Sequence, residues 1–212
     1  MAIPVIGWAI AASIGFILGK TFGGKRGPEP IWLRIRSCYE HTIFLKGEKG
    51  VGKDTILHIL KDGTFVENPN ATPKLHKKYF NACGRKLIVI NTAGDELNDD
   101  ENIKAREELD DDTKFIYVFN ADDYFANEKV KKLVQSDMKV EKKQCNEKGY
   151  KLKIIGTHKD KCLENGISEA EIQKLIDELG ENGRFECQIL DLTRAKTQGE
   201  EVQKELCDFI IA

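Results

Sequence analysis

The sequence predicts an α/β fold with a mainly parallel six-stranded sheet, one antiparallel edge hairpin and helices on both faces, preceded by one transmembrane helix. Short apolar runs of strand length alternate along the chain with segments of helical spacing, which is typical of this class. Two of these runs, Leu87–Ile90 and Phe115–Phe119, are continuously apolar, as strands buried on both faces are. In such sheets ligands bind at the carboxyl ends of the strands, so we expect a functional site there.

The composition indicates one globular domain with an appendage, since 212 residues that are 41% hydrophobic and 32% charged leave no room for two full domains. The net charge of −2 shows no basic excess, so nucleic acid is not expected as a partner. The six cysteines are scattered, with no pair at metal-ligand spacing. Reduced thiols in a reducing compartment are the simplest interpretation.

Residues 2–19 form an almost unbroken apolar run in which Ser13 is the only polar side chain. As a helix this run would span about 27 Å, close to the thickness of a bilayer's hydrocarbon core. Lys20, Lys25 and Arg26 follow it, so the positive-inside rule predicts a single-pass anchor with the rest of the chain in the cytoplasm. A cleaved signal peptide is the alternative, which the absence of a basic stretch before the run disfavours.

The predicted organisation is an anchor with the start of a linker (1–24), a juxtamembrane segment (25–40) and a globular domain (41–212). Small residues recur every four positions in the anchor and would line one side of its helix, which favours self-association with a second helix. The alternative is that glycine is simply common in transmembrane helices. The small residues concerned are Gly7, Ala11, Gly15 and Gly19.

The first predicted strand, Thr42–Leu45, enters a glycine-rich loop, and Ile56–Leu60 leaves it with helical spacing. Gly47, four further residues, then Gly52 and Lys53 match a phosphate-binding loop. In such a loop backbone N–H groups and the helix terminus surround phosphates, and the lysine reaches the β and γ phosphates. A plain glycine-rich turn is the alternative. The predicted phosphate-binding residues are Gly47, Lys49, Gly50, Val51, Gly52, Lys53, Asp54 and Thr55.

A surface loop and a hairpin follow this helix. The loop, Asp62–Pro73, contains Thr64 and Thr72. The hairpin consists of strands at Lys74–Asn81 and Lys86–Ile90 around a tight turn. Leu97–Asp112 is acidic and predicts a solvated helix or mobile segment.

The second half of the domain continues the alternation of strands and helices. After the strand Phe115–Phe119, an amphipathic helix is predicted at Tyr124–Lys148, with Val130, Leu133, Val134 and Met138 on its apolar face. Ser168 and Glu171 form a capping box at the start of the next helix, which ends at Leu179. The remaining predicted elements are strands at Lys151–Ile155 and Phe185–Leu190 and a closing helix at Gly199–Ile211.

Four polar motifs follow predicted strands in a fixed order, at Gly47–Thr55, Asn91–Glu96, Thr157–Asp160 and Arg194–Lys196. Together they resemble the phosphate loop, DxxG switch, NKxD motif and SAK loop of Ras- and Arf-type small GTPases, which are P-loop NTPases. The resemblance covers about Thr42 to Ala212. An anchor followed by such a domain is similar in architecture to signal recognition particle receptor β subunits.

The resemblance implies that the chain binds GTP and GDP. By similarity, Asp160 would accept hydrogen bonds from guanine N1–H and the 2-amino group, and adenine lacks both donors. Ala195 would donate its backbone N–H to guanine O6. Thr157 and His158 stand where the family usually has Asn and Lys, a variant that resembles Roc-type GTPase domains. The implied base-binding residues are Thr157, His158, Lys159, Asp160, Arg194, Ala195 and Lys196.

Two departures from the family pattern meet at the expected Mg²⁺. Asn91 replaces the DxxG aspartate, and Asp54 replaces the hydroxyl residue that binds the ion. We hypothesise that Asp54 supplies the charged metal ligand while Asn91 supplies a neutral hydrogen bond behind it. Thr72 resembles the switch threonine that senses the γ-phosphate and the ion, with Thr64 as the alternative. A degenerate site that binds no metal is the competing interpretation.

The expected catalytic residues are Thr72 and Asp95. Asp95 follows Gly94 of the switch motif, where Ras-like enzymes have the glutamine that orients the attacking water. A carboxylate here can orient water but repels the γ-phosphate, so we expect slow hydrolysis. The sequence therefore predicts a membrane-anchored GTP/GDP switch with an effector or activating partner. The alternatives are a pseudo-GTPase scaffold and an ATP-using P-loop enzyme, the latter disfavoured by Asp160 and Ala195.

Overall fold

The computed structural model describes residues 39–67, 76–92, 106, 109 and 112–211. The chain divides into two compact units, Met1–Tyr39 and Glu40–Ala212, and the fold below is that of the second. None of the helices in these described ranges is long and apolar enough to cross a membrane. The predicted anchor at 2–19, with its stripe of small residues, lies outside the described residues. So do Thr72, Gly94 and Asp95.

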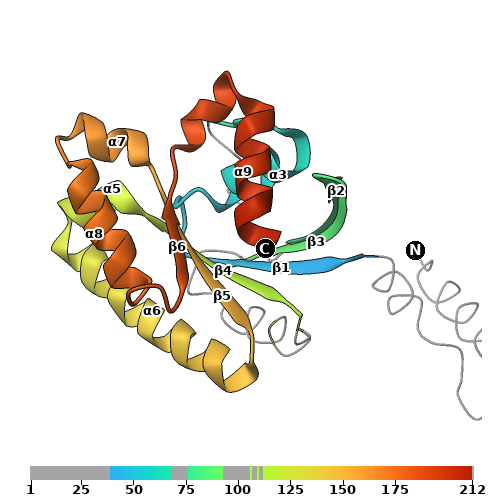
Figure 1. The fold of residues 1–212 in the computed structure, drawn as a ribbon, viewed down its shortest axis with the longest axis horizontal. Coiled ribbons are helices and arrows are strands. Elements are labelled where there is room, and N and C mark those ends of the chain that lie inside the picture. The colour runs from blue at the N-terminus through green and yellow to red at the C-terminus, as the bar shows by residue number, and fades with distance from the viewer. Residues whose placement is uncertain (1–38, 68–75, 93–105, 107–108, 110–111, 212) are drawn as a thin grey trace, which may run out of the picture. The chain divides into compact units, whose positions relative to one another are not determined.

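Six strands form one sheet in the order β2-β3-β1-β4-β5-β6 (Figure 1). The edge hairpin consists of β2 (His76–Ala82) and β3 (Arg85–Asn91), which are antiparallel. The other neighbours in the sheet are parallel. The mainly parallel sheet with an antiparallel edge hairpin is therefore confirmed. Its remaining strands are β1 (His41–Lys46), β4 (Lys114–Asn120), β5 (Lys151–Thr157) and β6 (Glu186–Ile189).

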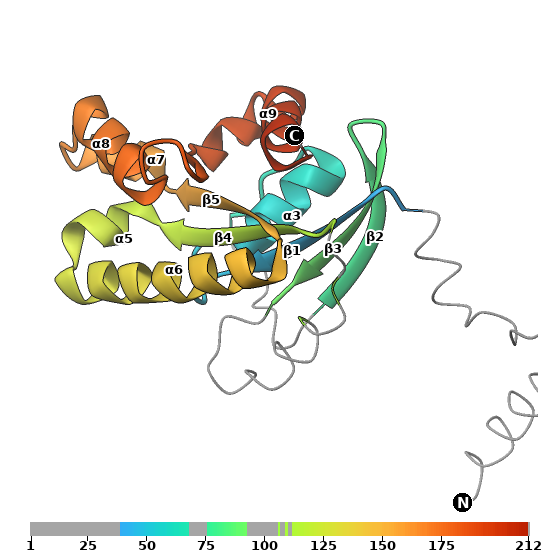
Figure 2. The same cartoon turned by 60° about the horizontal axis from the view of Figure 1, so that its bottom comes forward.

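Helices cover both faces of the sheet. Figure 2 shows α3 (Lys53–Asp62) and α9 (Gly199–Ile211) on one side and α6 (Glu128–Lys148) on the other. On the α3 and α9 side, inward residues of β1, β3 and β4 form one buried apolar cluster with the two helices. Burial of this cluster away from water is the main force that holds the layers together. Its members include Ile43, Leu45, Val89, Val118, Ile56, Leu60, Leu206 and Ile210.

The predicted helix at Tyr124–Lys148 is wrong in one respect, because two helices meet there. α5 (Ala121–Ala126) ends at Asn127, whose backbone is extended, and α6 begins directly after it. The Asn127 side chain accepts a hydrogen bond of 3.0 Å from the backbone N–H of Lys129. This is a helix N-cap, so the chain starts a new helix and changes direction.

The buried face of α6 also differs from the prediction. Leu133 is 44% exposed. The residues that α6 buries are Val134, Met138, Glu141 and Cys145, at spacings of a helical stripe. Leu133 stands one position before Val134 and therefore points about 100° away around the helix.

Three further helical elements lie along the second half of the domain. α8 (Glu169–Leu179) begins with the predicted capping box, in which Ser168 and Glu171 bond each other's backbone N–H groups. Two short elements were not predicted: α7 (Lys159–Glu164) and the 3₁₀ helix η2 (Leu192–Lys196). They follow β5 and β6 directly, and so they hold the last two polar motifs in helical turns.

Candidate functional site

The loop between β1 and α3 requires glycine at two positions. Gly47 lies so close to β4 that an added Cβ would stand 2.0 Å from the backbone oxygen of Val118. Gly52 precedes α3 with a φ of 95°, in the left-handed region that other residues rarely adopt. The loop therefore lies flat against the end of the neighbouring strand and turns directly into the helix.

Lys53, the first residue of α3, points back into this loop. Its side chain is buried, with 6% exposure, and its Nζ donates to the backbone oxygens of Gly47 at 2.6 Å and Glu48 at 2.7 Å. Burial lowers its pKa from 10.5 to about 8, although the nearby charges of Asp54 and Glu48 oppose that shift. The loop's own carbonyls therefore hold a poorly solvated ammonium group for which an anion would compete.

The other predicted loop residues differ in exposure. Val51 and Thr55 are buried, and Asp54 is half-buried. Lys49 and Gly50 are exposed, and so is Thr64 beyond α3.

Asp54 and Asn91 lie side by side, although they stand far apart in the sequence. The Nδ2 of Asn91, at the end of β3, donates to Oδ1 of Asp54 at 2.6 Å. The amide must face the carboxylate through its nitrogen, because the opposite orientation would set two oxygens against each other. Asn91 is 0% exposed, and its own Oδ1 has no hydrogen-bond partner among the described residues.

This arrangement fits an oxygen-preferring cation only as part of a larger ligand set. Asp54 offers a carboxylate, and Asn91 has a buried oxygen whose hydrogen-bonding capacity is unused within the described part of the chain. Over the same described ranges, no group of three His, Cys, Asp or Glu residues could hold a metal ion by itself. A Mg²⁺ ion here would need phosphate oxygens and water for its remaining positions.

Thr157, at the end of β5, joins three segments of the site. Its Oγ1 lies 2.9 Å from the backbone oxygen of Val51 in the loop and 3.2 Å from that of Phe119 in β4. The same oxygen is 2.8 Å from Nδ1 of His158. Since one hydroxyl proton serves one acceptor at a time, the two carbonyls share this donor. The hydroxyl therefore ties the β1–α3 loop to the ends of β4 and β5.

The last two motifs lie at the ends of β5 and β6. His158 has a φ of 62° and turns the chain into α7, where Asp160 lies half-buried in the first turn. The backbone N–H of Lys159 donates to the backbone oxygen of Leu190 at 3.3 Å, which links the segments that follow β5 and β6. Ala195 is buried in η2.

Three basic side chains of these motifs form ion pairs with carboxylates. Lys159 pairs with Glu169 at 3.0 Å, and Arg194 pairs with Glu205 on α9 at 3.1 Å. Lys196 pairs with Glu67 at 2.8 Å and lies over the ring of Phe65. The structure thus engages each of these predicted base-binding residues in a contact with another part of the domain.

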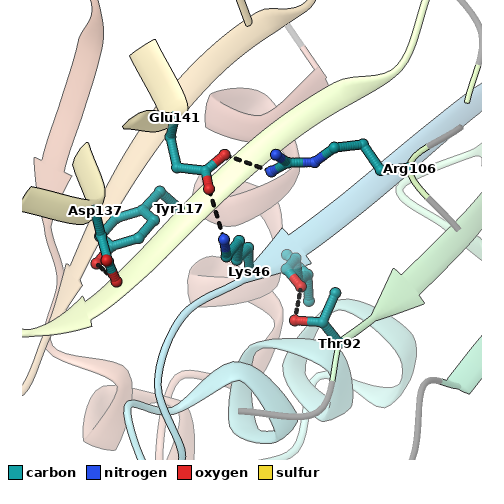
Figure 3. Close-up of polar contacts among 7 residues, drawn as sticks. Lys46, Thr92, Arg106, Tyr117, Asp137 and Glu141 are labelled. Carbon is teal, nitrogen blue, oxygen red and sulfur yellow. Dashed lines mark hydrogen bonds and ion pairs between the residues drawn. The ribbon is translucent and has the colours of Figure 1, made fainter. Parts of the chain in front are cut away.

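A buried carboxylate next to the loop was missed in the sequence. Glu141 of α6 is 0% exposed and lies between Lys46, at 2.6 Å, and Arg106 (Figure 3). The Arg106 guanidinium also lies 4.6 Å from the ring centroid of Phe115. Lys46 is the residue before Gly47, so this ion cluster fixes the entry to the loop.

Two neighbouring hydrogen bonds in the same view link the end of β3 to β1 and link β4 to α6. Thr92 Oγ1 donates to the backbone oxygen of Leu45 at 2.9 Å, and the Tyr117 hydroxyl donates to the Asp137 carboxylate at 3.3 Å (Figure 3).

A sequence signal for Glu141 existed, since it falls on the helical stripe of Val134, Met138 and Cys145.

No protein-family model and no curated protein sequence matches the chain. An interpretation of its function therefore depends on the geometry of these loops and on the motifs that form them.

Proposed function

We propose that this chain is a membrane-anchored guanine-nucleotide-binding protein, a GTP/GDP switch of the small-GTPase type with slow intrinsic hydrolysis. The main support is the loop between β1 and α3, which holds the Lys53 ammonium against its own carbonyls. An anion in this loop would meet both that ammonium and the positive end of α3. Phosphate is the anion that such loops bind, and the four motifs in order favour a nucleoside triphosphate.

Guanine selectivity is supported by the link between the phosphate loop and the end of β5. The hydrogen bond from Thr157 to Val51 joins the two segments. Asp160 follows Thr157 by three residues, so the chain that leads to Asp160 begins next to the phosphate loop. The Asp160 carboxylate would accept from guanine N1–H and the 2-amino group, and Ala195 would donate its N–H to O6. Adenine offers neither donor to Asp160, so the preference is for GTP over ATP.

In this proposal Mg²⁺ accompanies the nucleotide, held by Asp54 with Asn91 beside it, and neutralises charge on the phosphates. Without the ion, Asp54 near a phosphate would repel it by about 4 kcal/mol per charge pair at an effective dielectric of 20. We therefore expect EDTA to weaken nucleotide affinity by roughly a thousandfold. An affinity that EDTA leaves unchanged, measured by fluorescence titration with labelled GDP, would sink the metal assignment.

The proposed location follows from residues 2–19 and the basic residues after them. We propose a single-pass anchor with the nucleotide-binding domain in the cytoplasm, where GTP is present. Self-association through Gly7, Ala11, Gly15 and Gly19 belongs to the same proposal. An effector or activating protein is proposed as the partner, because Asp95 is a poor substitute for a water-orienting glutamine.

A second candidate function is a pseudo-GTPase, a scaffold at the membrane that binds nucleotide permanently or not at all. The direct bond of 2.6 Å between Asn91 and Asp54 favours it, because that bond uses the carboxylate oxygen that would otherwise face an ion. The two candidates share a fold and differ in nucleotide binding and turnover.

Nucleotide analysis of the purified full-length chain tests the proposal. The protein is denatured and its released nucleotides are separated by chromatography, then turnover is followed with Mg²⁺ and added GTP. We expect guanine nucleotide in near-stoichiometric amount, slow release of phosphate, and neither with Lys53→Met. Bound guanine nucleotide without turnover would favour the pseudo-GTPase. Adenine nucleotide, or no nucleotide even after incubation with GTP, would overturn the proposal.

A further inference from the structure

Two cysteines that stand far apart in the sequence meet where the β2–β3 turn packs on α9. The thiol of Cys83, in the turn, donates to the backbone oxygen of Gln203 at 3.7 Å. Gln203 lies one helical turn before Cys207, so the backbone N–H of Cys207 points to that same carbonyl. The Cys83 thiol also lies close enough to Cys207 to contribute to the raised pKa of the Cys207 thiol.

The turn and the helix are held in this relation by further contacts. Cys83 and Gly84 both have a positive φ, 49° and 74°, which is the backbone of a tight hairpin turn. Gln203 donates from Nε2 to the backbone oxygen of Leu60 at 2.8 Å, which ties α9 to the end of α3. The carbonyl that receives the Cys83 thiol is therefore fixed at a junction of three elements.

The two thiols differ in accessibility, as the partners of an ordered two-step reaction do. Cys83 is exposed to solvent, whereas Cys207 is 2% exposed. Burial, together with the neighbouring Cys83 thiol, raises the pKa of Cys207. An external reagent in solution therefore meets Cys83 first.

We propose that Cys83 and Cys207 form a redox-active dithiol, which a small disulfide such as oxidised glutathione converts reversibly into an intrachain disulfide. The Cys83 thiolate attacks one sulfur of the small disulfide, whose S–S bond breaks and releases one glutathione thiolate. The Cys207 thiol gives its proton to water and attacks the Cys83 sulfur, which releases the second glutathione thiolate. Two electrons thus pass from the protein thiols to the small disulfide.

The new bond would fasten the edge hairpin to the closing helix across a long stretch of chain. Such a cross-link restricts the unfolded chain and so stabilises the fold. In a cytoplasm with reduced glutathione the pair is a dithiol, and a more oxidising glutathione redox potential converts it to the disulfide. This inference does not depend on nucleotide binding, since the geometry concerns the turn, α3 and α9 alone.

The test uses the full-length chain, reduced and then incubated with oxidised glutathione. After free thiols are blocked with an alkylating reagent, peptide mass spectrometry identifies the linked peptides, and thermal unfolding is recorded in parallel. We expect a Cys83–Cys207 linkage with the loss of two hydrogens, a higher unfolding temperature, and reversal of both by a dithiol reductant.

The matched variants are Cys83→Ser, in an exposed turn, and Cys145→Ser at a buried position on α6. Cys145→Ser should keep the linkage, whereas Cys83→Ser should lose it and show no change of unfolding temperature on oxidation. Cys207→Ser should retain one glutathione on Cys83; if that variant does not fold, Cys83→Ser still decides. A stable glutathione adduct on wild-type Cys83 without a cross-link would overturn the proposal, as would a linkage between other cysteines.

Discussion

The surroundings of Lys53 oppose the charge of its own ammonium group. Folding lowers its pKa from 10.5 to about 8, because burial removes water from the ammonium group. Below about pH 8 both folded and unfolded chains are protonated there, and the folded state bears the full unfavourable contribution. As pH rises from about 8 towards 10.5, the folded protein loses the proton first, so this contribution to instability disappears. A buried lysine kept at such a cost suits a binding role.

Replacing Lys53 with methionine should abolish nucleotide binding without destabilising the protein. The substitution removes the buried charge, a gain of up to about 3 kcal/mol at neutral pH, but it also removes the two hydrogen bonds to the loop carbonyls, so we expect a net change of less than about 1 kcal/mol. Thermal unfolding of nucleotide-free protein measures it. Lys49→Met, at an exposed position in the same loop, should leave stability unchanged. A large loss of stability in Lys53→Met would mean that the lysine serves to hold the loop in place rather than to bind a ligand.

Nucleotide affinity should fall as the pH rises through the range in which Lys53 titrates. A phosphate requires the charged lysine, so binding takes up a proton once the free protein has lost it. With a pKa of about 8, we expect the dissociation constant to rise roughly fourfold between about pH 7 and about pH 8.5. Calorimetric titrations at several pH values give this slope and the proton uptake. Lys49→Met serves as the control that keeps the slope.

α6 supplies the carboxylate that balances two cations beside the loop. Glu141→Gln keeps the shape of the side chain but leaves Lys46 and Arg106 next to a neutral amide. We expect a loss of about 3 kcal/mol in the free energy of unfolding, at the low end for a broken buried pair because Lys46 is 34% exposed. Chemical denaturation measures this loss.

The matched control on the same helix is Glu147→Gln. Glu147 pairs with Lys143 at 3.9 Å, and both side chains are exposed, so its loss should cost less than about 0.5 kcal/mol. Equal effects of the two substitutions would show that the Glu141 cluster adds nothing special to stability.

Sequence periodicity could predict most of the elements but not where they touch. The apolar run Leu87–Ile90 and the capping box at Ser168 are local signals, and both correspond to observed elements. The break at Asn127 was missed because one asparagine in a long amphipathic stretch looks like a surface residue until its side chain caps a helix. The mainly parallel sheet followed from the α/β alternation, whereas the exact ends of each element depended on caps.

The contacts of the candidate site depend on the tertiary fold. The resemblance to small GTPases implied that Asp54 and Asn91 would meet at one ion, and in the structure their side chains are hydrogen-bonded to each other. It could not predict that Thr157 would bond the loop at Val51, because that contact exists only after β5 is laid beside β4. Likewise, scattered cysteines gave no sign that Cys83 and Cys207 would become neighbours.

At the scale of the whole domain, the two ends of the sheet have different roles in this account. The loops after β1, β3, β5 and β6, at the carboxyl ends of these strands, contain the motifs proposed to bind nucleotide, and Asn91 is the last residue of β3 at that end. The β2–β3 turn lies at the other end of β3, where the strand begins and where Cys83 contacts α9. We therefore expect oxidation of the cysteine pair to leave the nucleotide site open.

The central claim is that one pocket holds phosphates at Lys53 and guanine at Asp160. Competition of unlabelled GTP and ATP for labelled GDP on the full-length chain tests it most directly. Asp160→Asn is the variant to compare, since it replaces an acceptor of two charged hydrogen bonds and should weaken GTP by about 3 kcal/mol, roughly a hundredfold. GTP should displace the label from the wild type while ATP does not. Equal displacement by ATP and GTP, unaffected by Asp160→Asn, would contradict the account.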